Sequence, residues 1–376
     1  MSRGSRRPAR GQQGFALLVT LLVLVVGMTS FFLAAGDPAA EQQARRSSVA
    51  AAALAQAREL VLARALADIN RPGSIPCAAP DTGGSGTFSG NDCDANVGRL
   101  PYRTLDTPPL RDAGGELLWY AIDPSLRDRA SQEPVNPEDK PGSLSVNGQG
   151  NFAAVVIAPG DALAGQDRAA GSRGDFLEGG NGSGFDFTDC TGDPDCNDRV
   201  RGISTNRLFD AVQRRVLALV AEELVATWES SAATQSQRYL PYAAAFGADE
   251  CENGRELGRI PTADTDSDCG GLFLDTTELP SWVTDNGWLD LVVYRVDSDC
   301  TRAERNCSAA TLLVNGTGTH QAVVAGAGRP LGAQTRPGTG VAEFLEDNRN
   351  LDMDDAYADT PLTSSDNDVL NGVTLP

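Results

Sequence analysis

The chain carries an internal repeat, and this repeat limits the possible folds more than any other feature of the sequence. Residues 146–178 align with residues 314–346 without a gap, and 14 of the 33 positions are identical. Further upstream, GRLP at 98–101 corresponds to GRIP at 258–261. Because a one-residue slip turns the inward side chains of a strand outward, the gapless match predicts the same strands and turns in both copies.

A helical segment precedes each copy. Residues 40–70 are rich in strong helix formers and are closed by Arg71-Pro72. Residues 204–230 carry a mostly apolar stripe at helical spacing, with Ser204 or Thr205 as the N-cap. We interpret this stripe as core packing. It consists of Phe209, Val212, Val216, Leu219, Val220, Glu223 and Leu224.

Short runs rich in β-branched and aromatic residues follow each helical segment and have the length of strands. They lie at residues 116–122, 152–158, 289–296 and 321–327. The predicted fold class is therefore α+β, with a helix packed on a small antiparallel sheet present twice. We expect the first module at residues 37–200, the second at 201–357 and a C-terminal tail at 358–376.

An uncharged apolar run extends from Phe15 to Ala35. As a helix of about 31 Å it would cross the hydrocarbon core of a bilayer. Four arginines precede the run and the first acidic residues follow it, which predicts a cytoplasmic N-terminus. We expect a basic leader at 1–14 and a transmembrane helix at 15–36. A signal peptide cleaved before Gly36 is the alternative, although the run exceeds the usual apolar region of such peptides.

The junction of Gly14 and Phe15, after a basic leader and before the apolar run, resembles the processing site of type IV prepilins and type II secretion pseudopilins. The resemblance implies that a prepilin peptidase cuts between these residues and methylates the new N-terminus. The resemblance also implies that other pilin or pseudopilin subunits are partners of this protein. Most members carry Glu where this chain has Val19. An acidic residue there is tolerated because it meets the N-terminal amine of the preceding subunit, so its absence implies a tip or initiating subunit.

Residues 73–122 carry a second resemblance. A Pro-Cys pair, a Gly/Asp-rich loop, a second Cys, the GRLPY sequence and a Leu-Trp-Tyr run follow one another. This order is similar to a segment of prepilin-type proteins of unassigned role in Gram-negative bacteria. It supports the family and implies no activity.

The net charge of the chain is −20 at pH 7. Removal of residues 1–14, which contain four arginines, would bring it to −24. Such a charge argues against nucleic acid or an anionic lipid surface as a partner.

The chain has eight cysteines, an even number that predicts disulfides in an exported domain. Short loops favour pairing between near neighbours. Zinc is the rival interpretation, but the chain has no Cys-x-x-Cys and a single histidine, which makes a closed zinc site a poor match. The favoured pairs are Cys77 with Cys93, Cys190 with Cys196, Cys251 with Cys269, and Cys300 with Cys307.

Acidic loops lie close to these cysteines. Asp264, Asp266 and Asp268 alternate along one loop, and closely spaced carboxylates of this kind suit Ca²⁺. Further acidic residues cluster between Asp189 and Asp198 and between Asp347 and Asp355. None of these loops matches an EF-hand, so solvated acidic loops are the alternative. Ca²⁺ is the only cofactor that the sequence suggests.

The sequence shows no nucleophile elbow, Walker loop, zinc-protease motif or dinucleotide fingerprint. His320 aligns with Phe152 of the other copy, so we interpret its position as structural. We therefore expect a non-enzymatic minor pilin or pseudopilin-like subunit at the tip of a fibre. The alternative is a bitopic inner-membrane protein whose periplasmic head binds a partner or acts as an enzyme. Both predict a single-pass inner-membrane location with an outward-facing head.

Overall fold

The computed structural model describes residues 21–25, 38–128, 133–191, 193, 195–265, 267, 269–351, 355–359, 361, 363 and 366–376. Beyond the helical residues 21–25, the helices are α2 (Pro38–Ala67), α3 (Thr205–Ser230), α4 (Ser281–Asp285) and α5 (Asn348–Leu351). Ser204 is the N-cap of α3, because its hydroxyl accepts a hydrogen bond from the Arg207 N–H.

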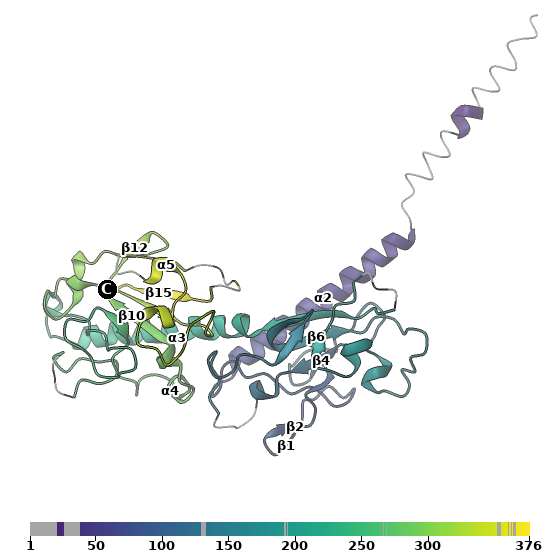
Figure 1. The fold of residues 1–376 in the computed structure, drawn as a ribbon, viewed down its shortest axis with the longest axis horizontal. Helices are drawn as coiled ribbons and strands as arrows, with labels where there is room; N and C mark the ends of the chain where they lie inside the picture. The colour runs from purple at the N-terminus through teal and green to yellow at the C-terminus, as the bar shows by residue number, and fades with distance from the viewer. Residues whose placement is uncertain are drawn as a thin grey trace, which may run out of the picture.

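Strands of the first half form a two-stranded hairpin, β1–β2, and a six-stranded sheet with the order β3-β4-β6-β5-β7, in which β8 also pairs with β6 (Figure 1). Their bounds are β1 Phe88–Ser89, β2 Asp92–Cys93, β3 Val97–Arg99, β4 Trp119–Ile122, β5 Leu144–Val146, β6 Gln149–Ala158, β7 Asp186–Phe187 and β8 Arg199–Ser204. All the pairs are antiparallel except β5 with β7, which is parallel.

Strands of the second half form a four-stranded sheet with the order β15-β13-β10-β9 and a three-stranded sheet with the order β12-β11-β14. Their bounds are β9 Leu257–Arg259, β10 Val292–Val296, β11 Leu312–Val314, β12 Thr317–His320, β13 Ala322–Gly326, β14 Ala356–Tyr357 and β15 Val369–Val373. Here β11 and β14 are parallel. We call α2 to β8 the first copy and α3 to β15 the second copy.

The strand registers of the two copies correspond. Tyr120 lies opposite Val156 between β4 and β6, and Tyr294 lies opposite Val324 between β10 and β13. Likewise Leu144 lies opposite Phe152, and Leu312 opposite His320. The sequence alignment equates Val156 with Val324 and Phe152 with His320, and each residue has its counterpart's position in the sheet. The repeat is therefore a repeat of structure.

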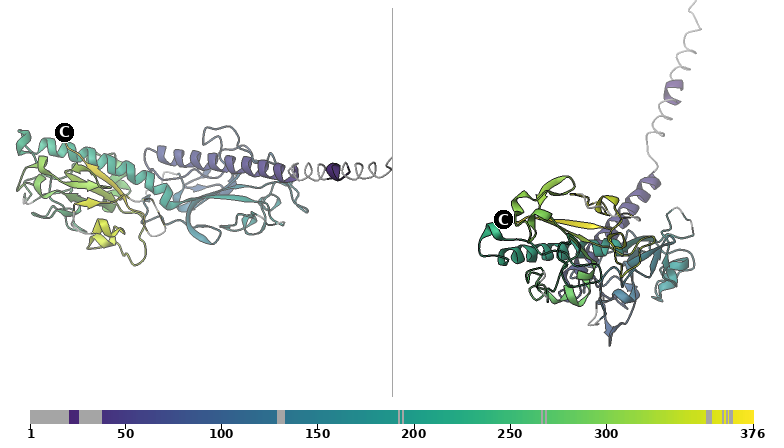
Figure 2. Two further views of the ribbon diagram at one scale, coloured as in Figure 1. Left: turned by 90° about the horizontal axis from the view of Figure 1, so that it is seen from above. Right: turned by 60° about the vertical axis from the view of Figure 1, so that its left-hand side comes forward.

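The two helices lie along one side of the molecule, with the sheets on the other (Figure 2, left). Helix α2 packs on β6 and β8, whereas α3 packs mainly on β13 and β15 and also contacts α2, β6 and β8. The buried face of α3 includes Phe209, Val212, Val216 and Val220, as its apolar stripe predicts. One continuous hydrophobic core joins both copies, and α3 runs through it.

The predicted fold class, a transmembrane helix followed by two pilin-like modules each with a small antiparallel sheet, is wrong. The described strands form four sheets, two strand pairs are parallel, and the core is continuous between the copies. The copies also differ in how their strands are divided between sheets. Strand β6 is continuous, whereas Gln321 interrupts the corresponding segment, because its side chain bonds to the Cys307 carbonyl (3.1 Å) and the Leu375 N–H (2.9 Å).

Among the residues that the structure describes, no helix is both long enough and apolar enough to cross a membrane. The predicted single-pass inner-membrane location is contradicted by this finding. The expected span at 15–36 lies outside the described residues, except for residues 21–25.

The region predicted as a tail at 358–376 contains β15, which pairs with β13 along five residues. Strand β15 corresponds to β8, and β8 spans the predicted boundary between residues 200 and 201. The segment V-L-N-G-V has weak strand propensity in isolation, because Asn and Gly are depleted in strands. Its strand conformation depends on the hydrogen bonds that β13 offers.

Candidate functional site

Each copy pairs a fully buried aspartate with a partly buried glutamate at the same place in the fold. Glu178 and Glu346 end the repeated Phe-Leu-Glu sequence, whose Phe and Leu side chains are buried. Asp198 and Asp368 lie directly before β8 and β15 and are both fully buried. Strand β8 pairs with β6 and strand β15 pairs with β13, and this pairing brings each aspartate to the glutamate of its own copy. In each copy the two residues offer carboxylate oxygens within 4.8 Å of one another.

In the first copy, backbone and amide donors hold both carboxylates. Oδ2 of Asp198 accepts hydrogen bonds from the Glu178 N–H (3.0 Å) and from Asn181 Nδ2 (2.9 Å). Glu178 accepts from Gln166 Nε2 (2.6 Å) and from the Asn197 N–H (3.1 Å), one at each carboxylate oxygen. Within the described part of the chain, Oδ1 of Asp198 accepts no hydrogen bond.

The second copy repeats this arrangement with fewer donors. Oδ2 of Asp368 accepts from the Glu346 N–H (3.0 Å) and the Asp347 N–H (3.4 Å). Oε2 of Glu346 accepts from the Asn367 N–H (3.1 Å). Both Oδ1 of Asp368 and Oε1 of Glu346 are buried and have no hydrogen-bond partner among the described residues. The second copy therefore leaves two carboxylate oxygens unsatisfied.

One change of hydrogen-bond partner and one substitution between the copies account for this difference. Gln334 corresponds to Gln166, but its amide donates to the carbonyls of Ala342 (3.2 Å) and Leu345 (3.4 Å). It therefore gives no bond to Glu346. Asp366 stands where the first copy has Cys196, and its carboxylate joins the pair within the same 4.8 Å. The second copy thus gathers three carboxylates where the first has two carboxylates and a disulfide sulfur.

Both aspartates have strongly raised pKa values. Burial raises the pKa of Asp198 to about 7, and the nearby Glu178 carboxylate acts in the same direction. Burial together with repulsion from Glu346 raises the pKa of Asp368 to about 8. A buried carboxylate with a second one beside it either holds a proton or meets a cation, because two negative charges repel each other in a medium of low polarity. Proton or cation binding is thus the chemistry open to these pairs.

An arginine stands beside each pair. Arg168 stacks on Phe176, with 5.1 Å from its guanidinium carbon to the ring centroid, and Arg336 stacks on Phe344 at 5.3 Å. Each donates to a glycine carbonyl, that of Gly160 or Gly328. Burial lowers the pKa of Arg336, whereas nearby carboxylates, including those of Glu346 and Asp368, oppose this effect.

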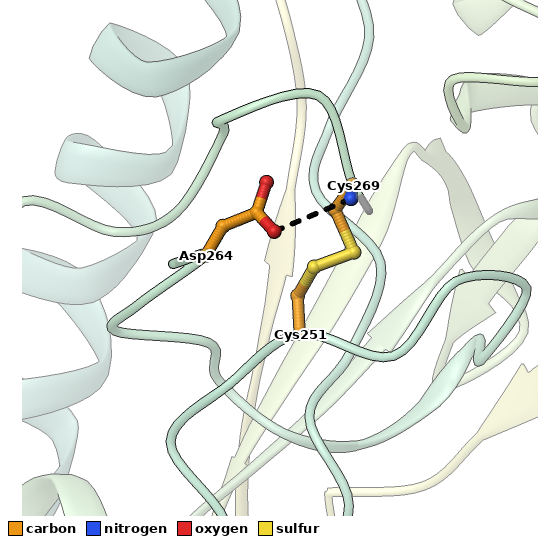
Figure 3. Close-up of side chains that lie close together, drawn as sticks. All are labelled: Cys251, Asp264 and Cys269. Atoms are coloured by element: carbon orange, nitrogen blue, oxygen red, sulfur yellow. Dashed lines mark hydrogen bonds between the residues drawn. A yellow bond between two sulfur atoms is a disulfide. The ribbon is translucent and has the colours of Figure 1, made fainter. Parts of the chain in front are cut away.

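Asp264 closes its own loop. Its two carboxylate oxygens accept hydrogen bonds from the backbone N–H groups of Cys269 (3.3 Å) and Gly271, and the side chain is buried beside the disulfide of Cys251 and Cys269 (Figure 3). These sulfurs are not metal-binding thiolates, because they are bonded to each other. Asp266 and Asp268 lie outside the described residues, so the predicted calcium site there stays a prediction.

All eight cysteines form disulfides between near neighbours, in agreement with the pairs favoured from the sequence. The bonds join Cys77 to Cys93, Cys190 to Cys196, Cys251 to Cys269, and Cys300 to Cys307. They close loops beside the sheets. The disulfide of Cys190 and Cys196 lies next to the carboxylate pair of the first copy, since the Cys190 N–H donates to the Asp198 carbonyl (2.9 Å).

His320 packs as the repeat predicts. A Cβ added to Gly372 would lie 2.6 Å from its imidazole ring, and a Cβ added to Gly202 would lie 2.3 Å from the ring of Phe152, the aligned residue. Nδ1 of His320 lies 2.9 Å from the Thr374 hydroxyl oxygen, and partial burial lowers its pKa. Gly14 and Phe15, the predicted processing residues, lie outside the described part.

The carboxylate pairs were missed from the sequence alone, although a signal was present. Asn197-Asp198 and Asn367-Asp368 are the same dipeptide, and each stands directly before a strand, β8 or β15. The gapless repeat ends at Glu178 and Glu346, and a two-residue difference in loop length then hides the second match. The sequence placed Asp198 only in an acidic loop.

Comparison of this chain with family models, with curated proteins and with solved structures finds no match.

Proposed function

We propose that this protein is a non-enzymatic, pilin-like or pseudopilin-like fibre subunit, placed at a tip or in initiation. The observation that carries the proposal is the helical segment of residues 21–25. Its five apolar side chains are all more than half exposed, and Val23 reaches 64 %. Isolated exposed apolar residues are ordinary, but five in succession on a helix form a surface that another chain would cover.

The sequence supports the same function. The apolar run follows a basic leader at the Gly14-Phe15 junction, and Val19 stands where most members of the resembling family carry an acidic residue. The apolar helix would pack against those of neighbouring subunits, and a prepilin peptidase would release its N-terminus. The duplicated, disulfide-linked part from α2 to β15 is the head that such a fibre would present.

Processing of the N-terminus tests the proposal. Mass spectrometry of the protein from its native host should find a mature chain that begins at Phe15 with a methylated amine. The Gly14→Val variant should keep the leader, because it removes the glycine of the Gly14-Phe15 junction on which the resemblance to the processing site rests. Gly11→Val, its matched control, leaves that junction intact and should be processed normally. A mature chain that begins at Met1 or at Gly36 would refute the proposal.

A further inference from the structure

We infer that the second copy of the repeat binds one calcium ion through Glu346, Asp366 and Asp368. This site differs from the acidic loop at Asp264, and the inference does not depend on the proposed function. It rests on the three carboxylates that the second copy gathers and on the two buried oxygens there that no donor reaches.

The distances fit a calcium ion. One carboxylate oxygen from each of the three residues lies within 4.8 Å of those from the other two. Calcium binds oxygen at about 2.3–2.6 Å, so ligands on opposite sides of the ion lie about 4.6–5.2 Å apart and adjacent ligands lie closer. Magnesium needs a near-ideal octahedron at about 2.0–2.1 Å and keeps several waters, so it is usually held by one or two carboxylates, whereas this cluster offers three.

The hydrogen bonds leave the right atoms available. Backbone N–H groups bind Oδ2 of Asp368 and Oε2 of Glu346, whereas Oδ1 of Asp368 and Oε1 of Glu346 have no partner among the described residues. Asp368 is fully buried, so bulk solvent does not reach its unpaired oxygen. A cation bound to these two oxygens would satisfy both. Glu346 and Asp366 are partly exposed and provide access from solvent.

The first copy serves as an internal comparison. There Gln166 donates to the Glu178 carboxylate and Cys196 replaces Asp366, which leaves two carboxylates and one unsatisfied oxygen. A single proton between Asp198 and Glu178 satisfies that arrangement. In the second copy one proton would leave two negative charges on three carboxylates, near Arg336, which interacts with Glu346 and Asp368, and Arg349, which interacts with Asp366. The divergence of the copies therefore assigns the cation to the second one.

Calcium binding by the purified full-length protein tests the inference. Isothermal titration with CaCl₂ in a buffer freed of metals should show one site, and Mg²⁺ should bind at least ten-fold more weakly. The Glu346→Gln and Asp366→Asn variants should each weaken calcium binding by at least ten-fold. Glu178→Gln, the same change at the matching position of the first copy, should leave binding unchanged.

Asp366 is partly exposed, so Asp366→Asn should keep the fold even where Glu346→Gln does not, and the melting temperature without calcium checks this. Added calcium should raise the melting temperature of the wild type and not that of Asp366→Asn. Absence of calcium binding at millimolar concentration would overturn the inference. Binding that survives Asp366→Asn, or that Asp264→Asn abolishes instead, would overturn it as well.

Discussion

Asp198 and Asp368 are fully buried acids that occupy corresponding positions in the two copies, yet their surroundings differ. Asn181 and Gln166 supply amide donors in the first copy, whereas Asp366 adds a third carboxylate in the second. The backbone arrangement is shared, so a few side chains decide whether the site suits a proton or a cation. For Asp198 we expect a proton, and its raised pKa makes this testable.

In metal-free buffer, Asp198 should make the fold less stable as the pH rises. The folded pKa is about 7 and the unfolded value is about 3.9. Between these values the unfolded chain has lost the proton that the folded chain retains. The contribution of this proton to stability is therefore complete below about pH 4 and disappears as the pH rises through 7. The Glu178 carboxylate helps to raise the pKa of Asp198, and the Asp198 carboxylate in turn acts to raise the pKa of Arg173.

The Asp198→Asn variant places an amide N–H where the protonated acid has its O–H. We expect its melting temperature to fall less than that of the wild type between pH 5 and pH 7.5, measured with a chelator present. Glu222→Gln, an exposed change on α3, is the control and should follow the wild type. Parallel pH curves for Asp198→Asn and the wild type would contradict the proposed proton.

At the scale of elements, the repeat preserves how a loop segment joins the edge of each sheet. Arg99 of β3 exchanges two backbone hydrogen bonds with Ala79 (2.8 and 2.9 Å), and Arg259 of β9 does the same with Ala244 (2.9 and 3.0 Å). A glycine precedes each arginine. The backbone approaches so closely there that a Cβ on Gly98 or Gly258 would lie 2.2 or 2.0 Å from the carbonyl oxygen of that alanine.

We therefore expect Gly258→Ala to destabilise the protein by about 1–3 kcal/mol, because the clash is with backbone and only a shift of the strand relieves it. Urea unfolding measures this change. Gly150→Ala is the matched control, since a Cβ on Gly150 meets no atom within 4 Å. Equal free energies of unfolding for the two variants would show that β9 does not approach Ala244 so closely.

At the scale of the whole molecule, the two copies share one core and do not stand apart. Helix α3 contacts the six-stranded sheet of the first copy and the four-stranded sheet of the second copy. The amide of Gln213 on this helix donates to the Ala327 carbonyl (2.6 Å). Asn286 of the second copy, which is buried, bonds to the first copy. Its Oδ1 accepts from the Val135 N–H (2.9 Å), and its carbonyl accepts from Asn136 Nδ2 (2.8 Å).

A shared core predicts cooperative unfolding. Calorimetry of the wild type should show one transition, with equal calorimetric and van't Hoff enthalpies. Asn286→Ala should lower the free energy of unfolding by about 1–3 kcal/mol, because it leaves the buried Val135 N–H without a partner. Asn253→Ala, at an exposed site of the same copy, should change it little. Two resolved transitions in the wild type would show that the copies fold independently.

Features that depend on nearby residues were predictable from the sequence. The N-cap and buried stripe of α3 follow from local pattern. The disulfides join cysteines at most 18 residues apart, and closing such short loops costs little conformational entropy. The equal registers of the two copies follow from a gapless alignment, because register depends on every intervening residue. The position of His320 as a packing residue follows from the same alignment.

Features that depend on residues meeting across the fold were decided by the tertiary structure. The sequence predicted a tail where β15 completes a sheet, and two separate modules where α3 joins one core. It also gave no reason to pair Glu346 with Asp368, because they are 22 residues apart and meet only when β15 pairs with β13. Local propensity reflects only interactions between residues close in sequence. Burial and sheet pairing depend on residues that meet in the complete fold. The carboxylate sites form through sheet pairing and burial, which the tertiary structure decides.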